Sequence, residues 1–116
     1  MNIERWAVWL ANLDPSFGTE AGKMRPVLVI QTDLLNATHF STAVLPITTN
    51  VTVNAHILRF NLGAVLPETG LSQNSDVLID QIRTIDNKRL KRKLGQIKDI
   101  GARQAIENQL KIVLDL

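Results

Sequence analysis

The sequence contains no cysteine and only two histidines, His39 and His56, among its 116 residues. The absence of thiols excludes disulfides and thiolate metal sites, and it is typical of proteins in a reducing compartment. Two separated histidines without cysteines do not predict a zinc site. No apolar run approaches the length of a transmembrane helix, and the N-terminus lacks the basic start and apolar core of a secretory signal. We therefore expect a cytoplasmic protein with no membrane partner.

The charges of the chain are nearly balanced, with a formal net charge of +2 at pH 7. Attraction to a nucleic acid would therefore have to come from a local cluster of basic residues. One such cluster follows Arg83 and consists of Lys88, Arg89, Lys91, Arg92 and Lys93. A solvated helical turn between two strands is the alternative interpretation of this basic run.

The length and the hydrophobic content of 45% predict one domain, residues 1–116, with a single hydrophobic core. Strands are predicted at residues 6–13, 27–31, 43–47, 56–60, 76–85 and 94–97. A C-terminal helix is predicted from Asp99, because one of its faces collects Ala102, Ile106, Leu110, Val113 and Leu114. Short strands followed by one helix indicate a mainly β fold, a small and mostly antiparallel barrel with the helix packed on it.

Three local features refine this fold. Pro46 interrupts the third predicted strand, and because proline cannot donate to a sheet ladder, we expect an edge or a bend there. Thr32 or Asp33 is placed to cap a single helical turn. Trp6 and Trp9 are interpreted as core residues or as part of a subunit interface.

Residues 18–30, GTEAGKMRPVLVI, join a polar loop to an apolar strand, with Arg25 and Pro26 at the junction. Proline biases the residue before it toward extended backbone, so Arg25 is expected at the strand entrance rather than on a loose loop. A guanidinium in that setting offers a planar, permanently charged fork that suits a phosphate. A surface arginine that caps the strand is the alternative.

Polar residues interrupt or follow the predicted strands at 20–25, 48–50 and 80–83, where a sheet would present them together. Ordinary turn chemistry is an alternative for Thr48, and an ion pair with Arg83 or Arg25 is an alternative for Asp80. The sequence has no GxxxxGK[ST] motif, no cluster of metal ligands and no Ser-His-Asp set. An arginine, a hydroxyl, carboxylates and a basic flank favour phosphoryl transfer on RNA, where the substrate supplies its own 2′-OH nucleophile.

Several motifs follow one another in the order VWLANLDPSFGTEAGKMRPVLVIQTD, VLPITTN, VLIDQIRTIDNKRLKRKLG and a helix ending in LKIVL. This succession resembles the MazF/PemK family, the ribonuclease toxins of bacterial toxin–antitoxin modules, and DQIRTID is its most distinctive part. The resemblance implies an SH3-like small β-barrel, the MazF/PemK/CcdB-like plasmid-toxin fold, with a C-terminal helix and a homodimeric assembly. It also implies sequence-specific cleavage of single-stranded RNA or mRNA without a metal or other cofactor, and inhibition by a cognate antitoxin.

The resemblance assigns catalytic roles to Arg25, the arginine of the RP motif, and to Thr48, the hydroxyl residue after PI. The positions that match the lining of the family's RNA groove are Phe17, Glu20, Asp80, Gln81 and Arg83. The sequence departs from the family at Thr19, where some members carry a histidine implicated in catalysis, so no histidine mechanism is expected. It also has Arg5-Trp6 where other members have Arg-Gly, a difference that concerns packing more than activity.

The expected reaction is attack of the 2′-OH on the adjacent phosphorus, which gives a 2′,3′-cyclic phosphate and a 5′-hydroxyl. Arg25 is expected to stabilise the developing charge, and Thr48 to donate a hydrogen bond or relay a proton. The general base stays open between Glu20 and Asp80. One alternative is a non-enzymatic CcdB-like toxin that binds DNA gyrase, which would not need the Arg25–Thr48 pair. A ribosomal type of RNA-binding module is another, and it is disfavoured because the basic charge is so local.

Overall fold

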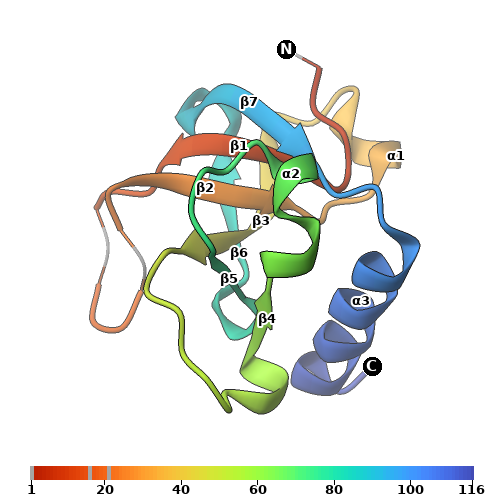
Figure 1. Cartoon of the computed structure of the whole chain (residues 1–116). Helices are drawn as coiled ribbons and strands as arrows, with labels where there is room; N and C mark the ends of the chain where they lie inside the picture. The colour runs from red at the N-terminus through yellow and green to blue at the C-terminus, as the bar shows by residue number, and fades with distance from the viewer. Residues whose placement is uncertain (1, 16, 21) are drawn as a thin grey trace.

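Short strands and a single long helix form the framework of the computed structural model in Figure 1. The structure describes residues 2–15, 17–20 and 22–116. The strands in these ranges are β1 (Ala7–Asn12), β2 (Met24–Val29), β3 (Ser41–Thr48), β4 (Arg59–Asn61), β5 (Asp76–Leu78), β6 (Arg83–Asp86) and β7 (Leu90–Gln96). The helices are α1 (Asp33–Asn36), α2 (Leu66–Thr69) and α3 (Ile100–Leu114), with 3₁₀ turns at His56–Leu58, Gly63–Val65, Ile79–Gln81 and Asn87–Arg89. None of the helices in the described ranges combines the length and apolar character that crossing a membrane requires.

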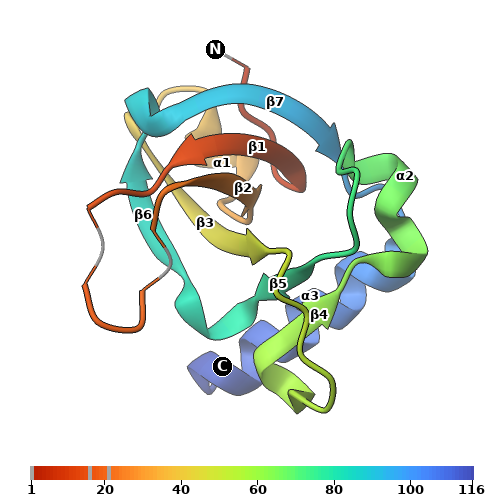
Figure 2. The same ribbon diagram turned by 60° about the vertical axis from the view of Figure 1, so that its left-hand side comes forward.

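The strands form one antiparallel sheet in the order β4-β5-β3-β2-β1-β7, and β6 pairs with β3 beside this path. Strand β3 is central. It pairs with β2 along one edge, while its other edge pairs first with β6 and then, from Ile47 on, with β5. The sheet curves strongly on itself, as Figure 2 shows. The predicted small antiparallel barrel is therefore confirmed as an architecture, although the edge strands β4 and β7 do not pair with each other in the described residues.

Both faces of the central strands are buried, which explains why their sequences are apolar almost throughout rather than alternating. One core cluster includes Val8, Leu28 and Leu45 and is covered by α3. The other cluster includes Trp9 and Val27 and is enclosed by the strands and the N-terminal segment. Trp6 and Trp9 are 5% and 7% exposed, so both tryptophans belong to the core of the chain and not to an exposed interface.

Helix α3 starts and packs as its sequence predicts. The Asp99 carboxylate caps it by accepting a hydrogen bond from the Ala102 N–H at 2.8 Å. Ala102, Ile106 and Leu110 are buried against the first core cluster, whereas Leu114, at the end of the predicted apolar face, is exposed. The predicted turn near residue 33 is also present, and Thr32 is its N-cap.

Two predicted strands are shorter or more broken than expected. The segment 56–60 starts as the 3₁₀ turn His56–Leu58, and only its end joins β4. The segment 76–85 is divided by the 3₁₀ turn Ile79–Gln81 into β5 and β6, which pair with different parts of β3. A single straight strand cannot follow β3 through this change of partner, so the chain turns at the polar residues that interrupt the apolar run.

The predictions for the third and last strands also need correction. Pro46 lies inside an unbroken central β3 and not at an edge. It falls between the last β3 residue paired with β6, Val44, and the first paired with β5, Ile47, so its missing N–H breaks no bond of either ladder on that edge. Strand β7 begins at Leu90 rather than at Leu94, so only the start of the basic run is a helical turn.

A close backbone contact joins the end of α2 to β7. Gly70, which has a φ of +75°, lies so near β7 that a Cβ there would be 2.0 Å from the Leu94 carbonyl oxygen. From the other side, a Cβ on Gly95 would be 2.4 Å from the Thr69 carbonyl carbon. Only glycine fits both the left-handed backbone and this spacing at position 70. The contact fixes where the following loop, residues 71–75, leaves α2.

We expect Gly70→Ala to lower the free energy of unfolding by more than about 2 kcal/mol. The left-handed backbone alone costs a residue with a Cβ about 1–2 kcal/mol, and the contact with Leu94 adds to that cost. Urea denaturation measures the change. Gly18→Ala is the matched control, because Gly18 has a φ of +57° but no atom within 4 Å of its added Cβ. Equal losses for the two variants would show that the contact with β7 contributes nothing.

Candidate active site

Arg25 and Thr48 line the same hollow, of about 230 Å³, at the ends of β2 and β3. The pairing of the two strands explains this. Val27 lies opposite Pro46, and continuing the same antiparallel register by two residues on each strand brings Arg25 opposite Thr48. We call this space the Arg25–Thr48 hollow. The structure therefore brings together the two residues that the sequence separates by more than twenty positions.

One hydrogen bond orients the Arg25 side chain and leaves its two terminal nitrogens without a partner in the described residues. Arg25 is the second residue of β2, so the strand begins earlier than predicted and the arginine lies within it rather than at its entrance. Its Nε donates a hydrogen bond to the Gly22 carbonyl at 2.8 Å. In the described part of the chain its terminal nitrogens make no hydrogen bond or ion pair. The guanidinium is therefore held in one orientation, and its terminal nitrogens can donate to an anion.

The Thr48 hydroxyl also keeps its donor available. Its Oγ1 accepts a hydrogen bond from the Asn50 N–H at 3.1 Å, which is the turn chemistry considered for this residue. Because a hydroxyl has one proton and two lone pairs, accepting this bond leaves the Thr48 proton free to donate. Turn formation and a catalytic role are therefore compatible at this position.

Four of the five predicted groove residues gather in a second hollow of about 200 Å³, which we call the Glu20–Asp80 hollow. Its described lining consists of Thr19, Glu20, Asp80, Gln81, Ile82 and Arg83. It joins the β1–β2 loop to the break between β5 and β6, and it shares no lining residue with the Arg25–Thr48 hollow. Phe17, the fifth residue, lies on the β1–β2 loop with 76% of its surface exposed.

Two of these groove residues, Glu20 and Arg83, make hydrogen bonds to the backbone of the β1–β2 region. Glu20 accepts a hydrogen bond from the Phe17 N–H at 2.9 Å, which stabilises the loop turn. Arg83 Nη1 donates a hydrogen bond to the Leu13 carbonyl oxygen at 3.4 Å. No ion pair joins Asp80 to Arg25 within the described residues, so the Arg25 part of the alternative for Asp80 is wrong, and a pair with Arg83 stays a prediction.

The basic run divides into an inward and an outward part. Arg89 donates to the Asn12 carbonyl at 3.1 Å and also to the Asp14 carbonyl, so it holds the end of β1 in place. The other four basic residues are exposed: Lys88, Lys91, Arg92 and Lys93. Within the basic run, these four side chains offer free positive charge to a partner.

A buried carboxylate that the sequence analysis did not single out supports the site. Asp76 is 1% exposed, and it accepts hydrogen bonds from the Thr52 N–H at 3.0 Å, Asn61 Nδ2 at 3.0 Å and Arg59 at 3.2 Å. Burial raises the pKa of this carboxyl, but the bonds from Thr52, Asn61 and Arg59 lower the pKa further, so it lies below its ordinary value. The sequence signal was an acidic residue directly before the apolar run Val77–Leu78–Ile79, where a carboxylate needs partners.

The Asp76 cluster is connected to Thr48 in two ways. Thr48 lies directly opposite Asp76 in the pairing of β3 with β5. Arg59, held by Asp76, also donates to the Asn50 carbonyl at 2.7 Å, and the Asn50 N–H is the group that bonds the Thr48 hydroxyl. The buried ion pair therefore fixes the turn that positions Thr48.

The geometry is that of a small curved antiparallel sheet with a C-terminal helix and with a cationic and a hydroxyl residue in one hollow. The chain belongs to the PemK-like, MazF-like toxins of type II toxin–antitoxin systems, because the model of that family matches residues 4–114. The family that the sequence motifs resemble is thereby confirmed.

Individual relatives agree with this assignment. Endoribonuclease MazF9 of Mycobacterium tuberculosis is 32% identical over 119 residues, which cover 98% of this chain and 98% of the relative. The solved structure of M. tuberculosis toxin MazF-mt6 is 26% identical with a TM-score of 0.76, over 95% of this chain and 97% of that one. MazF from Deinococcus radiodurans is 22% identical with a TM-score of 0.82, over 100% and 99% of the two chains. These structures confirm the fold.

We expect Asp76→Asn to lower the free energy of unfolding at neutral pH by about 3 kcal/mol, because it breaks the ion pair with Arg59. This value is the lower end of the usual cost for a buried pair, since Arg59 is partly exposed. A depressed folded-state pKa contributes stability that is present above the unfolded pKa of about 3.9 and is lost as the pH falls through the folded value. The wild type should therefore lose more stability than the variant on acidification.

Thermal or urea unfolding across the range from pH 7 to pH 3 measures both effects. Asp115→Asn is the matched control, since Asp115 is an exposed acidic residue at the C-cap of α3. If Asp76→Asn and Asp115→Asn change stability equally at neutral pH, the buried carboxylate does not hold the loop as described.

Proposed function

We propose that this chain is a sequence-specific endoribonuclease toxin that cleaves single-stranded RNA in the cytoplasm and is neutralised by a cognate antitoxin. The observation that carries the proposal is the Arg25–Thr48 hollow, whose lining includes a guanidinium oriented by one hydrogen bond and a hydroxyl with a free proton. Such a pair can bind the two non-bridging oxygens of one phosphodiester. Membership of the toxin family and the endoribonuclease relative support RNA as the substrate.

In the proposed reaction the 2′-oxygen attacks the adjacent phosphorus and the bond from phosphorus to the 5′-oxygen breaks. The 2′-OH proton passes to a base, a proton reaches the leaving 5′-oxygen, and the products are a 2′,3′-cyclic phosphate and a 5′-hydroxyl. Arg25 stabilises the charge that builds on the phosphoryl oxygens, which is commonly the largest catalytic term. Arg25 is not the base, because its pKa above about 12 keeps it protonated near neutrality. No metal is needed in this scheme, because Arg25 supplies the positive charge.

Thr48 donates a hydrogen bond to a phosphate oxygen or relays the proton to the leaving group. Glu20 and Asp80 remain the two candidate proton acceptors, and both line the neighbouring Glu20–Asp80 hollow. We propose that this hollow, with Gln81 and Arg83, carries the RNA strand on its way past the Arg25–Thr48 hollow. The exposed Phe17 ring on the same loop suits stacking on an unpaired base.

The proposed partners follow from the exposed surface. The exposed basic residues Lys88, Lys91, Arg92 and Lys93 can pair with an acidic antitoxin segment, and the chain belongs to a family of toxins from toxin–antitoxin systems. We propose a homodimer because the C-terminal end leaves Ile112, Leu114 and Leu116 exposed. A gyrase-binding toxin without enzymatic activity is not favoured, since the curated relative is an endoribonuclease.

Arg25→Ala should lower the rate of RNA cleavage by at least about a hundredfold, the usual scale for removing one charge-stabilising donor. Arg25→Lys should recover only part of the rate, because a point charge does not reproduce a bidentate fork. Initial rates on a defined RNA, measured in EDTA to remove free metal ions, test both variants.

Control variants separate chemistry from folding. Circular dichroism should show that Arg25→Ala stays folded, because the side chain makes a single hydrogen bond in the described structure. Thr48→Ser should retain more activity than Thr48→Val, which keeps the shape and removes the hydroxyl. Cleavage by Arg25→Ala at the wild-type rate would place the reacting phosphate elsewhere.

One 2′-deoxy substitution immediately 5′ of the cut phosphate should stop cleavage at that bond while binding persists. The substitution removes the nucleophile and leaves the phosphates and bases in place. A matched oligonucleotide with the 2′-deoxy position several nucleotides away is the control and should be cut normally. Normal cleavage at the deoxy position would mean that water or a side chain attacks, and the proposed mechanism would be wrong.

A further inference from the structure

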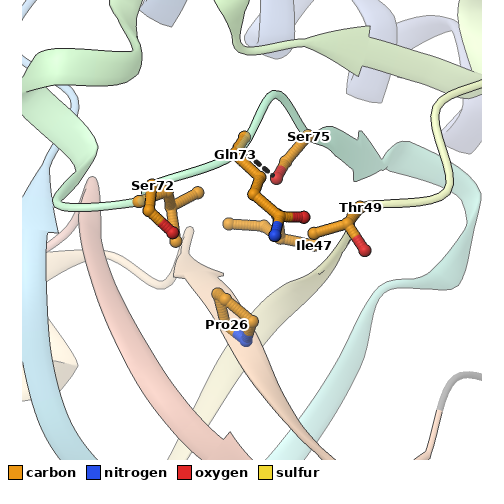
Figure 3. Close-up of a pocket in the computed structure, with 7 residues that line it drawn as sticks. Pro26, Ile47, Thr49, Ser72, Gln73 and Ser75 are labelled. Carbon is orange, nitrogen blue, oxygen red and sulfur yellow. Dashed lines mark hydrogen bonds between the residues drawn. The ribbon is translucent and has the colours of Figure 1, made fainter.

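A third hollow, of about 230 Å³, opens directly beside the Arg25–Thr48 hollow, and we call it the Gln73 hollow. The two hollows share Pro26, Ile47 and Thr49 as lining residues, so they adjoin each other. The opposite side of the Gln73 hollow comes from the loop of residues 71–75, which lies over the ends of β2 and β3 in Figure 3. A chain segment that places a phosphate at Arg25 would therefore extend into this space.

The chemistry of the lining has two parts. Pro26, Ile47 and Leu71 supply an apolar base, and Thr49, Ser72 and Gln73 supply polar groups at the margin. A nucleobase has the same division, because its flat faces are apolar and its edges carry hydrogen-bond donors and acceptors. The volume is below the range of drug-sized ligand pockets, which suits a single ring system rather than a longer ligand.

Hydrogen bonds fix the backbone of the loop that carries Gln73, whereas the side-chain amide of Gln73 makes none in the described residues. Ser75 is 2% exposed. Its hydroxyl donates to the Gln73 carbonyl at 2.9 Å, and its carbonyl accepts from the Leu62 N–H at 2.8 Å. At the other end, the Leu71 N–H donates to Thr69 Oγ1 at 3.2 Å. The Gln73 side-chain amide has no hydrogen bond among the described residues, and Figure 3 shows it extending toward Ile47 and Thr49.

We propose that the Gln73 hollow binds the nucleobase next to the cleaved phosphate and that the Gln73 amide reads the edge of that base. This inference rests on the proposed RNA cleavage and adds a determinant of its sequence specificity. An amide presents one acceptor and one donor side by side, and glutamine uses this pair to distinguish bases. Thr49 and Ser72 have only hydroxyls, which donate or accept by rotation and therefore discriminate less. Pre-ordering of the loop lowers the cost of binding.

The test compares cleavage sites on one long RNA of mixed sequence for the wild type, Gln73→Ala and Gln73→Glu. A good bidentate base contact discriminates against the wrong base by roughly 5- to 150-fold. Gln73→Ala should lose that factor at one position next to the cut and keep the wild-type preference at all others. Gln73→Glu keeps the shape but replaces the amide donor by an acceptor, so the preferred base at the same position should change. Gln73 is exposed, so both variants should fold, and thermal unfolding checks this.

Gln104→Ala is the matched control, because Gln104 is an exposed glutamine on α3 outside this hollow. It should cut at the wild-type sites with the wild-type preference. If the wild type cuts RNA and both Gln73 variants keep its preference at every position, the Gln73 inference is overturned while the proposed function stands. If the wild type does not cut RNA in the same assay, the proposed function fails, and this inference fails with it.

Discussion

The central strand β3 has to pair with different partners on its two edges, and the rest of the molecule depends on how it does so. One edge holds β2, while the other passes from β6 to β5 near Pro46. Because a proline has no N–H, it suits the point where one ladder ends and the next begins. Beyond this point Thr48 lies opposite Asp76 of β5, and it lines one hollow with Arg25 of the neighbouring strand β2.

Burial on both faces of the sheet restricts where chemistry can occur. The inner strand positions fill two apolar clusters, and the polar residues of the two candidate hollows lie near strand ends, at a break and on a loop. The Arg25–Thr48 hollow is formed at strand ends, and the Glu20–Asp80 hollow is formed by a loop and by the break between β5 and β6. The buried Asp76 lies at the start of β5, and its three donors make it a structural support for the turn at Thr48.

Features that depend on local chemistry could be predicted from the sequence. Asp99 and the apolar spacing after it lie within one helix, so the start of α3 and its buried residues Ala102, Ile106 and Leu110 were predicted correctly, while Leu114 was not. The succession of motifs sufficed to identify the family. The pairing partners of short strands depend on residues far apart in the chain, so the 3₁₀ break at Ile79–Gln81 and the continuous path of β3 through Pro46 were not predicted. For the same reason the Asp76–Arg59 pair was missed, since its members come from two different strands.

The candidate site shows the same limit at a finer scale. That Arg25 and Thr48 belong together was inferred from the resemblance, and the β2–β3 register supplies the physical reason. Glu20 and Asp80 lie in a separate hollow because of the path of the β1–β2 loop. The glycines and polar residues of this loop do not determine that path, so it could not be predicted from the sequence.

The close approach of α2 to β7 has a consequence for how this chain can change over evolutionary time. The loop of residues 71–75 is held by backbone atoms of Gly70 and Leu94 and by the hydroxyls of Thr69 and Ser75. The side chains at positions 72 and 73, which line the Gln73 hollow, take no part in that anchoring. Substitutions there alter the surface beside the Arg25–Thr48 hollow without disturbing the framework, so the loop can diversify among descendants, or in a designed library, while the barrel stays constant.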